Sequence, residues 1–296
     1  MIHVASFYRF ATIDDPLALA PTVLRWCAAG GLRGSVLIAA EGINGALAGE
    51  MAALQRTLQL LRTLPRCADL AATLVPVTAG VRPFRRLRVR VRDEIVTFQG
   101  GAPSTAGAAT VGASGGASAG SFGCPSGGAS GDVVAGGAVD AAAWHALLDD
   151  PDVLVLYVRN DYETALGGFP GAVAPQTGHF SQFPAFVDAQ LAGRTDRPVA
   201  MYCTGGIRCA KAGAWMRERG FEAVYELRGG VLGYLQNVAP EQNRWQGNCF
   251  VFDARVSVDR HLQPGGERLC RGCGAPWRPM SGDDGRQCNP CRDAAA

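Results

Sequence analysis

The sequence predicts an α+β domain and an α/β domain in one chain of 296 residues, joined by a low-complexity segment and followed by a cysteine-rich tail. In the first part, strand and helix patterns follow one another in the order β-α-β-β-α-β. In the second, short apolar strands alternate with helices, which is typical of a parallel sheet covered on both sides. The stretch between them is mainly Gly, Ala and Ser and cannot bury a core. We therefore divide the chain into a first domain, a flexible linker, a second domain and a C-terminal extension, at residues 1–99, 100–137, 138–240 and 241–296.

The first domain has the element order of a ferredoxin-like or acylphosphatase-like sandwich. Proline near its start favours a first helix that begins at Pro16. Leucines at helical spacing indicate a second helix after Met51. The predicted elements are a strand over 3–10, a helix over 16–29, strands over 34–40 and 42–48 joined by a tight turn, a helix over 51–64 and a strand over 86–98.

Arginine alternates with apolar residues in the last of these strands. Because successive side chains point to opposite faces of a strand, one face carries a row of guanidinium groups. The planar fork of arginine suits phosphate. In a chain with a formal net charge of only +2, such a row favours contact with nucleic acid over the alternative, a solvated sheet face. The row consists of Arg86, Arg88, Arg90 and Arg92.

The second domain is predicted from Asp140 onward. A helix carries Trp144 and two leucines on one face, and a strand covers 153–158. A helix over 183–191 and a strand over 199–202 follow. Active residues of α/β sheets gather at the carboxyl ends of the strands. The residue after this last strand therefore stands where a catalytic group is expected.

That residue is Cys203, which opens the segment Tyr-Cys-Thr-Gly-Gly-Ile-Arg-Cys before a helical pattern over 210–219. Loop amides, a helix N-terminus and the charge of Arg208 predict a lowered thiol pKa and an exposed thiolate. The alternative is a buried structural cysteine. The combination favours a reactive site. Cys203 and Arg208 are its predicted catalytic residues, with a substrate-binding cradle made of Thr204, Gly205, Gly206 and Ile207. With four residues between Cys203 and Arg208, the loop resembles that of rhodanese-type sulfurtransferases, which carry a persulfide.

Further segments extend this resemblance over most of the chain outside 100–137. They are EGINGALAG at 41–49, PFRRLRVRVRDEIV at 83–96, LVLYVRNDYETALGGFPGAV at 154–173, VYELRGGVLGYL at 224–235 and WQGNCFVFDARV at 245–256. Together they resemble the rhodanese-domain tRNA uridine(34) hydroxylases. The resemblance implies hydroxylation of the wobble uridine to 5-hydroxyuridine, with molecular oxygen as co-substrate and tRNA as partner. It also implies that Glu41 and Asn44 contribute to substrate binding. The chain departs from the family's usual acidic residue at Tyr157, Ala210, Asn248 and Ala254.

Two other functions fit parts of the sequence. A plain sulfurtransferase fits the loop equally well, although the arginine row argues for a macromolecular substrate. A non-catalytic module fits less well, because the loop keeps its cysteine.

Arg159 is predicted to form a structural ion pair, with Glu163 as a partner. Gly229 and Gly230 are predicted to allow a close backbone approach near the loop.

Composition and cysteine spacing bear on the compartment of the protein and on a metal site. The sequence has no apolar run of 18 residues and no secretory signal pattern, so we expect a cytoplasmic protein without membrane contact. Four of its ten cysteines form two Cys-x2-Cys pairs separated by fourteen residues, a spacing that suits tetrahedral zinc. The alternative is a disordered cysteine-rich tail. We predict a structural zinc site at Cys270, Cys273, Cys288 and Cys291, and no organic cofactor.

Overall fold

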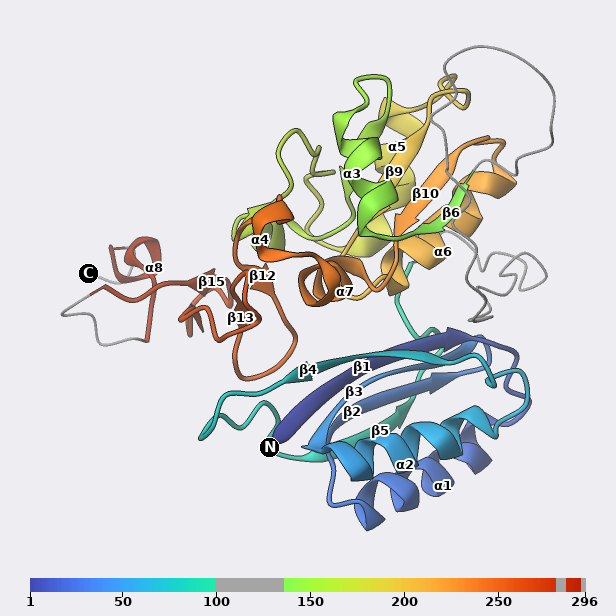
Figure 1. The fold of residues 1–296 in the computed structure, drawn as a ribbon, viewed down its shortest axis with the longest axis vertical. Helices are drawn as coiled ribbons and strands as arrows, with labels where there is room; N and C mark the ends of the chain where they lie inside the picture. Colours follow the sequence, from blue (N-terminus) through green and yellow to red (C-terminus); the bar gives the residue numbers. More distant parts are fainter. Residues whose placement is uncertain (99–135, 281–285, 294–296) are drawn as a thin grey trace.

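The computed structural model describes residues 1–98, 136–280 and 286–293 of the chain. Figure 1 shows an α+β domain and an α/β domain, one above the other, and a C-terminal segment that leads away from them. The predicted fold class is therefore confirmed. Of the predicted linker 100–137, residues 100–135 lie outside the described residues, and residues 136–137 form the start of a strand of the second domain.

The first domain is a five-stranded sheet in the order β4-β1-β3-β2-β5, with two helices on one face. All neighbouring strands are antiparallel except β2 and β5, which are parallel. The helices bury leucines of α2, such as Leu54 and Leu58, against Val36 and Ile38 of β2. The elements are β1 (Ile2–Phe10), α1 (Pro16–Ala29), β2 (Arg33–Ala39), β3 (Gly42–Glu50), α2 (Met51–Arg62), β4 (Ala71–Pro76) and β5 (Leu87–Val91).

The last strand of the predicted β-α-β-β-α-β order is β4, which the sequence analysis missed. The arginine-bearing strand β5 is an additional edge strand beside β2. It ends at Val91, so the predicted strand over 86–98 was too long. Residues 92–98 instead cross to the second domain, where Phe98 is fully buried against Phe180 and Trp215.

The second domain is a parallel sheet in the order β6-β10-β9-β7, covered on both faces. One core gathers Trp144, Tyr157 and Tyr202, and the other gathers Phe183, Trp215 and the site cysteine Cys203. Its helices and strands are β6 (Gly136–Val139), α3 (Ala141–Asp149), β7 (Leu154–Tyr157), α4 (Asp161–Thr164), β8 (Gly167–Gly168), α5 (Phe183–Gln190), β9 (Val199–Tyr202), α6 (Ile207–Glu218), β10 (Val224–Leu227) and α7 (Gly230–Asn237).

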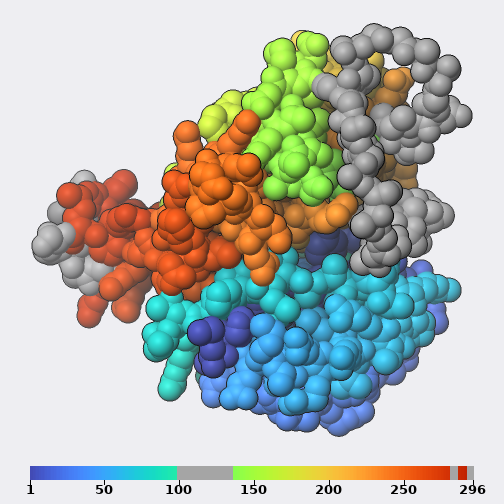
Figure 2. Space-filling model, viewed as in Figure 1, coloured from blue at the N-terminus to red at the C-terminus, as the bar shows by residue number. Residues whose placement is uncertain are grey.

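The C-terminal extension first returns to the second domain and then leaves it. β11 (Gln246–Gly247) pairs with β8, and β12 (Cys249–Phe250) pairs with β13 (Ser257–Val258). The hairpin of β14 (Arg268–Leu269) and β15 (Pro276–Trp277) and the helix α8 (Asn289–Asp293) follow. Figure 2 shows this last part projecting from the body of the molecule. Among the described residues, no helix has the length and apolar character needed to cross a membrane.

Candidate functional site

The site loop is shorter than the sequence analysis expected. Cys203 follows β9, and α6 already begins at Ile207, three residues before the predicted start of the helix. Gly206 makes the turn with φ of 96°, in the left-handed region that glycine tolerates. Arg208 and Cys209 therefore lie in the first turn of α6, where the helix dipole favours a negative charge.

The Cys203 thiol is buried, so the expectation of an exposed thiol was wrong: the residue is 2% exposed. The Gly206 amide donates a hydrogen bond to its Sγ at 3.2 Å. Burial alone raises the pKa of Cys203. Hydrogen bonds from the thiol and amide of Cys209, with the charges of Arg208 and Arg159, outweigh burial and lower the pKa to about 5. At neutral pH the group is therefore a thiolate.

Cys209 is the partner thiol of this pair. It is fully buried in the first turn of α6. Burial, together with its hydrogen bond to Cys203 and the charge there, raises the pKa of Cys209 well above its usual value. Cys203 is thus ionised, while Cys209 keeps its proton and donates a hydrogen bond to the Cys203 thiolate.

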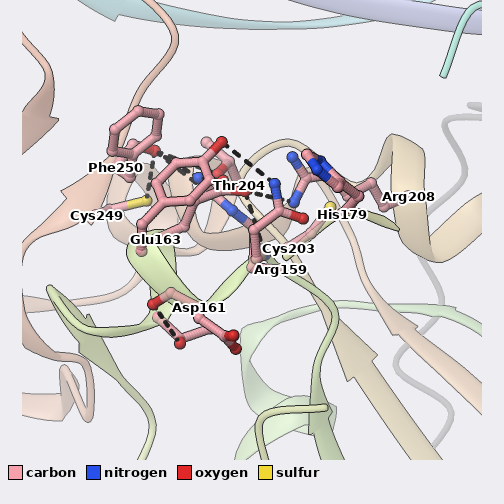
Figure 3. Close-up of polar contacts among 12 residues, drawn as sticks. Arg159, Asp161, Glu163, His179, Cys203, Thr204, Arg208, Cys249 and Phe250 are labelled. Carbon is pink, nitrogen blue, oxygen red and sulfur yellow. Dashed lines mark hydrogen bonds and ion pairs between the residues drawn. The ribbon is translucent and has the colours of Figure 1, made fainter. Parts of the chain in front are cut away.

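A buried carboxylate holds the two arginines of the site (Figure 3). Glu163, which is fully buried in α4, pairs with Arg159 and accepts from Arg208 Nη1 at 2.9 Å. The predicted ion pair of Arg159 and Glu163 is therefore confirmed. Because Glu163 neutralises one of the two guanidinium charges, the arrangement keeps one net positive charge near the thiolate.

The C-terminal extension completes the site, which the sequence analysis missed. The carbonyl oxygen of Phe250 accepts from Thr204 Oγ1 at 3.3 Å and from Arg159 Nη1 at 3.3 Å (Figure 3). The neighbouring Cys249 is buried, and burial raises its pKa to about 11. The clue in the sequence was the apolar segment around these two residues, which lies beyond the second domain.

Gly230 supports the loop from the side of α7. It has φ of 60°, and a Cβ atom there would lie 2.6 Å from the carbonyl carbon of Thr204. The amide of Val231 donates to the Cys203 carbonyl at 2.9 Å. The predicted close approach of Gly229 and Gly230 to the loop is therefore confirmed at Gly230.

Glu41 and Asn44 lie at the junction of the two domains. Glu41 accepts from Lys211 Nζ at 2.9 and 2.8 Å and from the amide of Ile95 at 2.7 Å. Asn44 Nδ2 donates to the Ile95 carbonyl at 2.9 Å. Glu41 thus joins the crossing segment 92–98 to Lys211 of α6, and Asn44 joins the same segment to β3. Their direct contact with substrate stays a prediction.

Lys211 is a site residue that the sequence analysis overlooked. It is 1% exposed, and its ammonium also donates to Glu94 Oε1 at 2.6 Å and to the Val96 carbonyl at 3.1 Å. The sequence did contain a signal: Lys211 is its sole lysine, among 28 basic residues. A compact ammonium with three donors fits this enclosed site, whereas a planar guanidinium does not.

The arginine row lies on the sheet face that turns away from α1 and α2. Arg86, Arg88, Arg90 and Arg92 are all exposed, and the apolar residues between them are half-buried on the helix side. The register joins Arg90 to Leu37, Leu37 to Asn44, and Asn44 to Tyr8. A Cβ atom on Gly206 would lie 3.0 Å from the Tyr8 hydroxyl, so this face leads from the arginines to the site loop.

The four tail cysteines come together as predicted. Their Sγ atoms all lie within 4.8 Å of one another, and those of Cys273 and Cys288 are 3.8 Å apart. Metal–sulfur bonds of about 2.3 Å in a tetrahedron place sulfur atoms about 3.8 Å apart. The cluster can therefore hold a metal ion.

Comparisons with known proteins agree with these two domains. Residues 2–95 match the family model of the UPF0176 acylphosphatase-like domain, and residues 140–237 match that of the rhodanese-like domain. The chain is 41% identical to a tRNA uridine(34) hydroxylase of Caulobacter vibrioides, over 98% of this chain and 87% of the relative. It is also 41% identical to one of Synechococcus elongatus, over 98% and 95%. The chain belongs to the tRNA uridine(34) hydroxylase family.

Proposed function

We propose that this protein is a tRNA-modifying oxidoreductase that converts the wobble uridine to 5-hydroxyuridine with molecular oxygen, using Cys203 as nucleophile. The observation that carries the proposal is the buried Cys203 thiolate, with a pKa of about 5, at the end of a face lined by arginines. Family membership supports the substrate, since the relatives are named for uridine 34 of tRNA.

The thiolate is suited to addition to a pyrimidine ring. Bond formation between Cys203 Sγ and C6 of uracil breaks the C5=C6 π bond and leaves the electron pair at C5, conjugated with the C4 carbonyl. C5 then takes one oxygen atom from O2. The second oxygen atom leaves as water, with two electrons and two protons from two thiol groups of a reductant, which become a disulfide. Loss of the C5 proton re-forms the double bond and expels Cys203.

The residues around Cys203 have separate roles in this proposal. Arg208 and the Gly206 amide stabilise the thiolate before addition and after expulsion. We infer that the loop from Thr204 to Ile207 forms the cradle that receives the substrate. Glu41 and Asn44 are already engaged at the domain junction, which favours positioning of the loop over direct contact with RNA.

The arginine row and the tail have supporting roles. We infer that Arg86, Arg88, Arg90 and Arg92 bind phosphates of tRNA, because their guanidinium groups are exposed on the face that leads to Cys203. A tRNA substrate also fits the cytoplasm as compartment. Zinc is the metal that best suits the four thiolates of Cys270, Cys273, Cys288 and Cys291, and it would serve the fold of the tail.

The decisive test compares Cys203→Ser with the wild type in cells that lack the native protein. Serine keeps the volume, but its hydroxyl does not ionise in the same loop. We expect 5-hydroxyuridine, measured by mass spectrometry of tRNA nucleosides, to fall to background. Cys67→Ser, which removes a buried thiol of the first domain, should leave the product in place.

The alternative is a sulfurtransferase, and the same variants separate the two. The Gly206 amide that donates to Cys203 Sγ would also suit the terminal sulfur of a persulfide. Sulfur transfer from thiosulfate to cyanide by the wild type, without any change in 5-hydroxyuridine on deletion of the protein, would favour this alternative. Full hydroxylation by Cys203→Ser would refute the nucleophile.

A further inference from the structure

Phe252 is an exposed aromatic residue beside the site loop. It is 61% exposed, while its neighbour Val251 is 4% exposed. Its ring lies 5.6 Å from the guanidinium carbon of Arg208 and 5.5 Å from that of Arg159. Phe250 and the two arginines pack against the ring, and its exposed part is open to a ligand next to the site loop.

The backbone on both sides of Phe252 is held in place. Val251 donates to the Val256 carbonyl at 2.8 Å, and Val256 donates to the Asp253 carbonyl at 3.0 Å. Asp253 also pairs with the buried Arg255. The Phe252 ring packs on Phe250 at 5.2 Å, and the Phe250 carbonyl accepts from the site loop. Phe252 is therefore presented by a rigid turn.

This turn also contacts the first domain next to the arginine row. The amide of Ala254 donates to the Pro83 carbonyl at 2.8 Å, between the exposed Arg82 and Arg85. The turn that carries Phe252 thus binds the segment that leads into the basic strand, and the Phe252 ring contacts Arg208 of the site. A basic surface with an aromatic platform is the arrangement by which proteins hold unpaired nucleotides. A purely apolar protein partner would not explain the cations on both sides.

We propose that Phe252 stacks on a nucleobase of the anticodon loop next to the uridine that Cys203 attacks. This inference rests on the proposed function and adds the residue that orients the loop. Stacking fixes the neighbouring base, the packing of Arg208 and Arg159 on Phe252 holds its ring in place, and the exposed arginines of the row attract the phosphates. The uridine is then free to leave the stack and enter the site.

The test measures binding of a synthetic anticodon stem-loop RNA with uridine at position 34. Loss of one stacking contact, worth about 1–3 kcal/mol, corresponds to a five- to 150-fold rise in Kd for Phe252→Ala. Phe252→Leu keeps an apolar side chain without a ring and should bind as weakly as the alanine variant. Phe252→Trp should restore the affinity, and its added indole fluorescence should be quenched by the RNA. Leu269→Ala, which truncates another exposed apolar residue, should not change Kd.

Each outcome separates this proposal from the proposed function. Wild-type affinity of Phe252→Ala for an RNA that the wild type binds and hydroxylates would overturn the stacking contact alone. Wild-type affinity of Phe252→Leu would show that an apolar side chain without a ring is enough for binding, and it would also overturn the stacking contact. A wild-type protein that neither binds nor hydroxylates the stem-loop would overturn the proposed function itself.

Discussion

At the scale of residues, the site depends on two cysteines in different protonation states, an ionised Cys203 and a neutral Cys209. Cys203 is buried and nevertheless ionised, because the first turn of α6 supplies hydrogen bonds and Arg208 supplies charge. Cys209 keeps its proton because it is buried next to a thiolate. A thiolate shielded from water keeps its reactivity for a substrate that enters the loop.

The pH dependence of Cys203 alkylation tests this charge pattern. The thiolate is the reactive form, so the rate constant should fall about tenfold per pH unit below a midpoint near 5 and be flat above it. Cys209→Ala removes the thiol donor and should move the midpoint to higher pH, while Cys209→Ser keeps a donor and should move it less. The measurement follows iodoacetamide modification of the Cys203 peptide by mass spectrometry. A midpoint near the ordinary 9 in the wild type would contradict the pattern.

At the scale of elements, α6 supplies both the hydrogen-bond donors to Cys203 and the lysine that joins the two domains. Its N-terminus lies under Cys203, and Lys211, one turn further along, reaches Glu41 and Glu94 of the first domain. The loop and the domain junction are thus fixed by the same helix. Movement of the first domain against α6 would move the site loop as well.

Substitution of Lys211 tests this coupling. Lys211→Met leaves two carboxylates together without their cation and should lower the free energy of unfolding by about 3–5 kcal/mol. Lys211→Arg keeps the charge but overfills the site and should cost about 1–3 kcal/mol. Arg217→Met, also on α6, breaks a more exposed pair with Glu226 of β10 and should cost less than Lys211→Met. Urea unfolding followed by tryptophan fluorescence compares the three, and wild-type stability of Lys211→Arg would contradict the fit argued for lysine.

At the scale of the whole molecule, three parts of the chain build one site. The second domain supplies the loop, the first domain supplies Tyr8 and the arginine face, and the C-terminal extension supplies Phe250. The described residues 268–280 and 286–293 at the end of this extension belong to none of the hydrophobic cores, and their four cysteines come together. We therefore expect the tail to depend on metal and the two domains to be independent of it.

Metal content measures this dependence. The purified protein should hold one zinc ion per chain, and Cys273→Ala with Cys288→Ala should lose it. Hydrogen exchange should then rise in residues 268–280 and 286–293, while protection of both domain sheets stays unchanged, since their cores contain no residue of this segment. A wild-type protein without metal, or a double variant that keeps its zinc, would refute the site.

The sequence by itself determined the parts of this protein that depend on neighbours along the chain. The helix over Pro16–Ala29, the strand that delivers Cys203, the alternation of arginines on β5 and the two Cys-x2-Cys pairs all follow from local spacing. The spacing of these residues along the chain predicts helices and strands because it matches the periodicity of the helix and strand backbone.

Only the tertiary structure decided which of these parts meet. Lys211 binds Glu41 across 170 positions of the chain, and Arg159 binds the Phe250 carbonyl across 91. It also decided that β4 and the arginine strand β5 form the two edges of the first sheet, and that the Cys203 thiol is buried. The physical reason is the same in each case: burial and long-range pairing depend on how separate elements pack, and no local pattern contains that information.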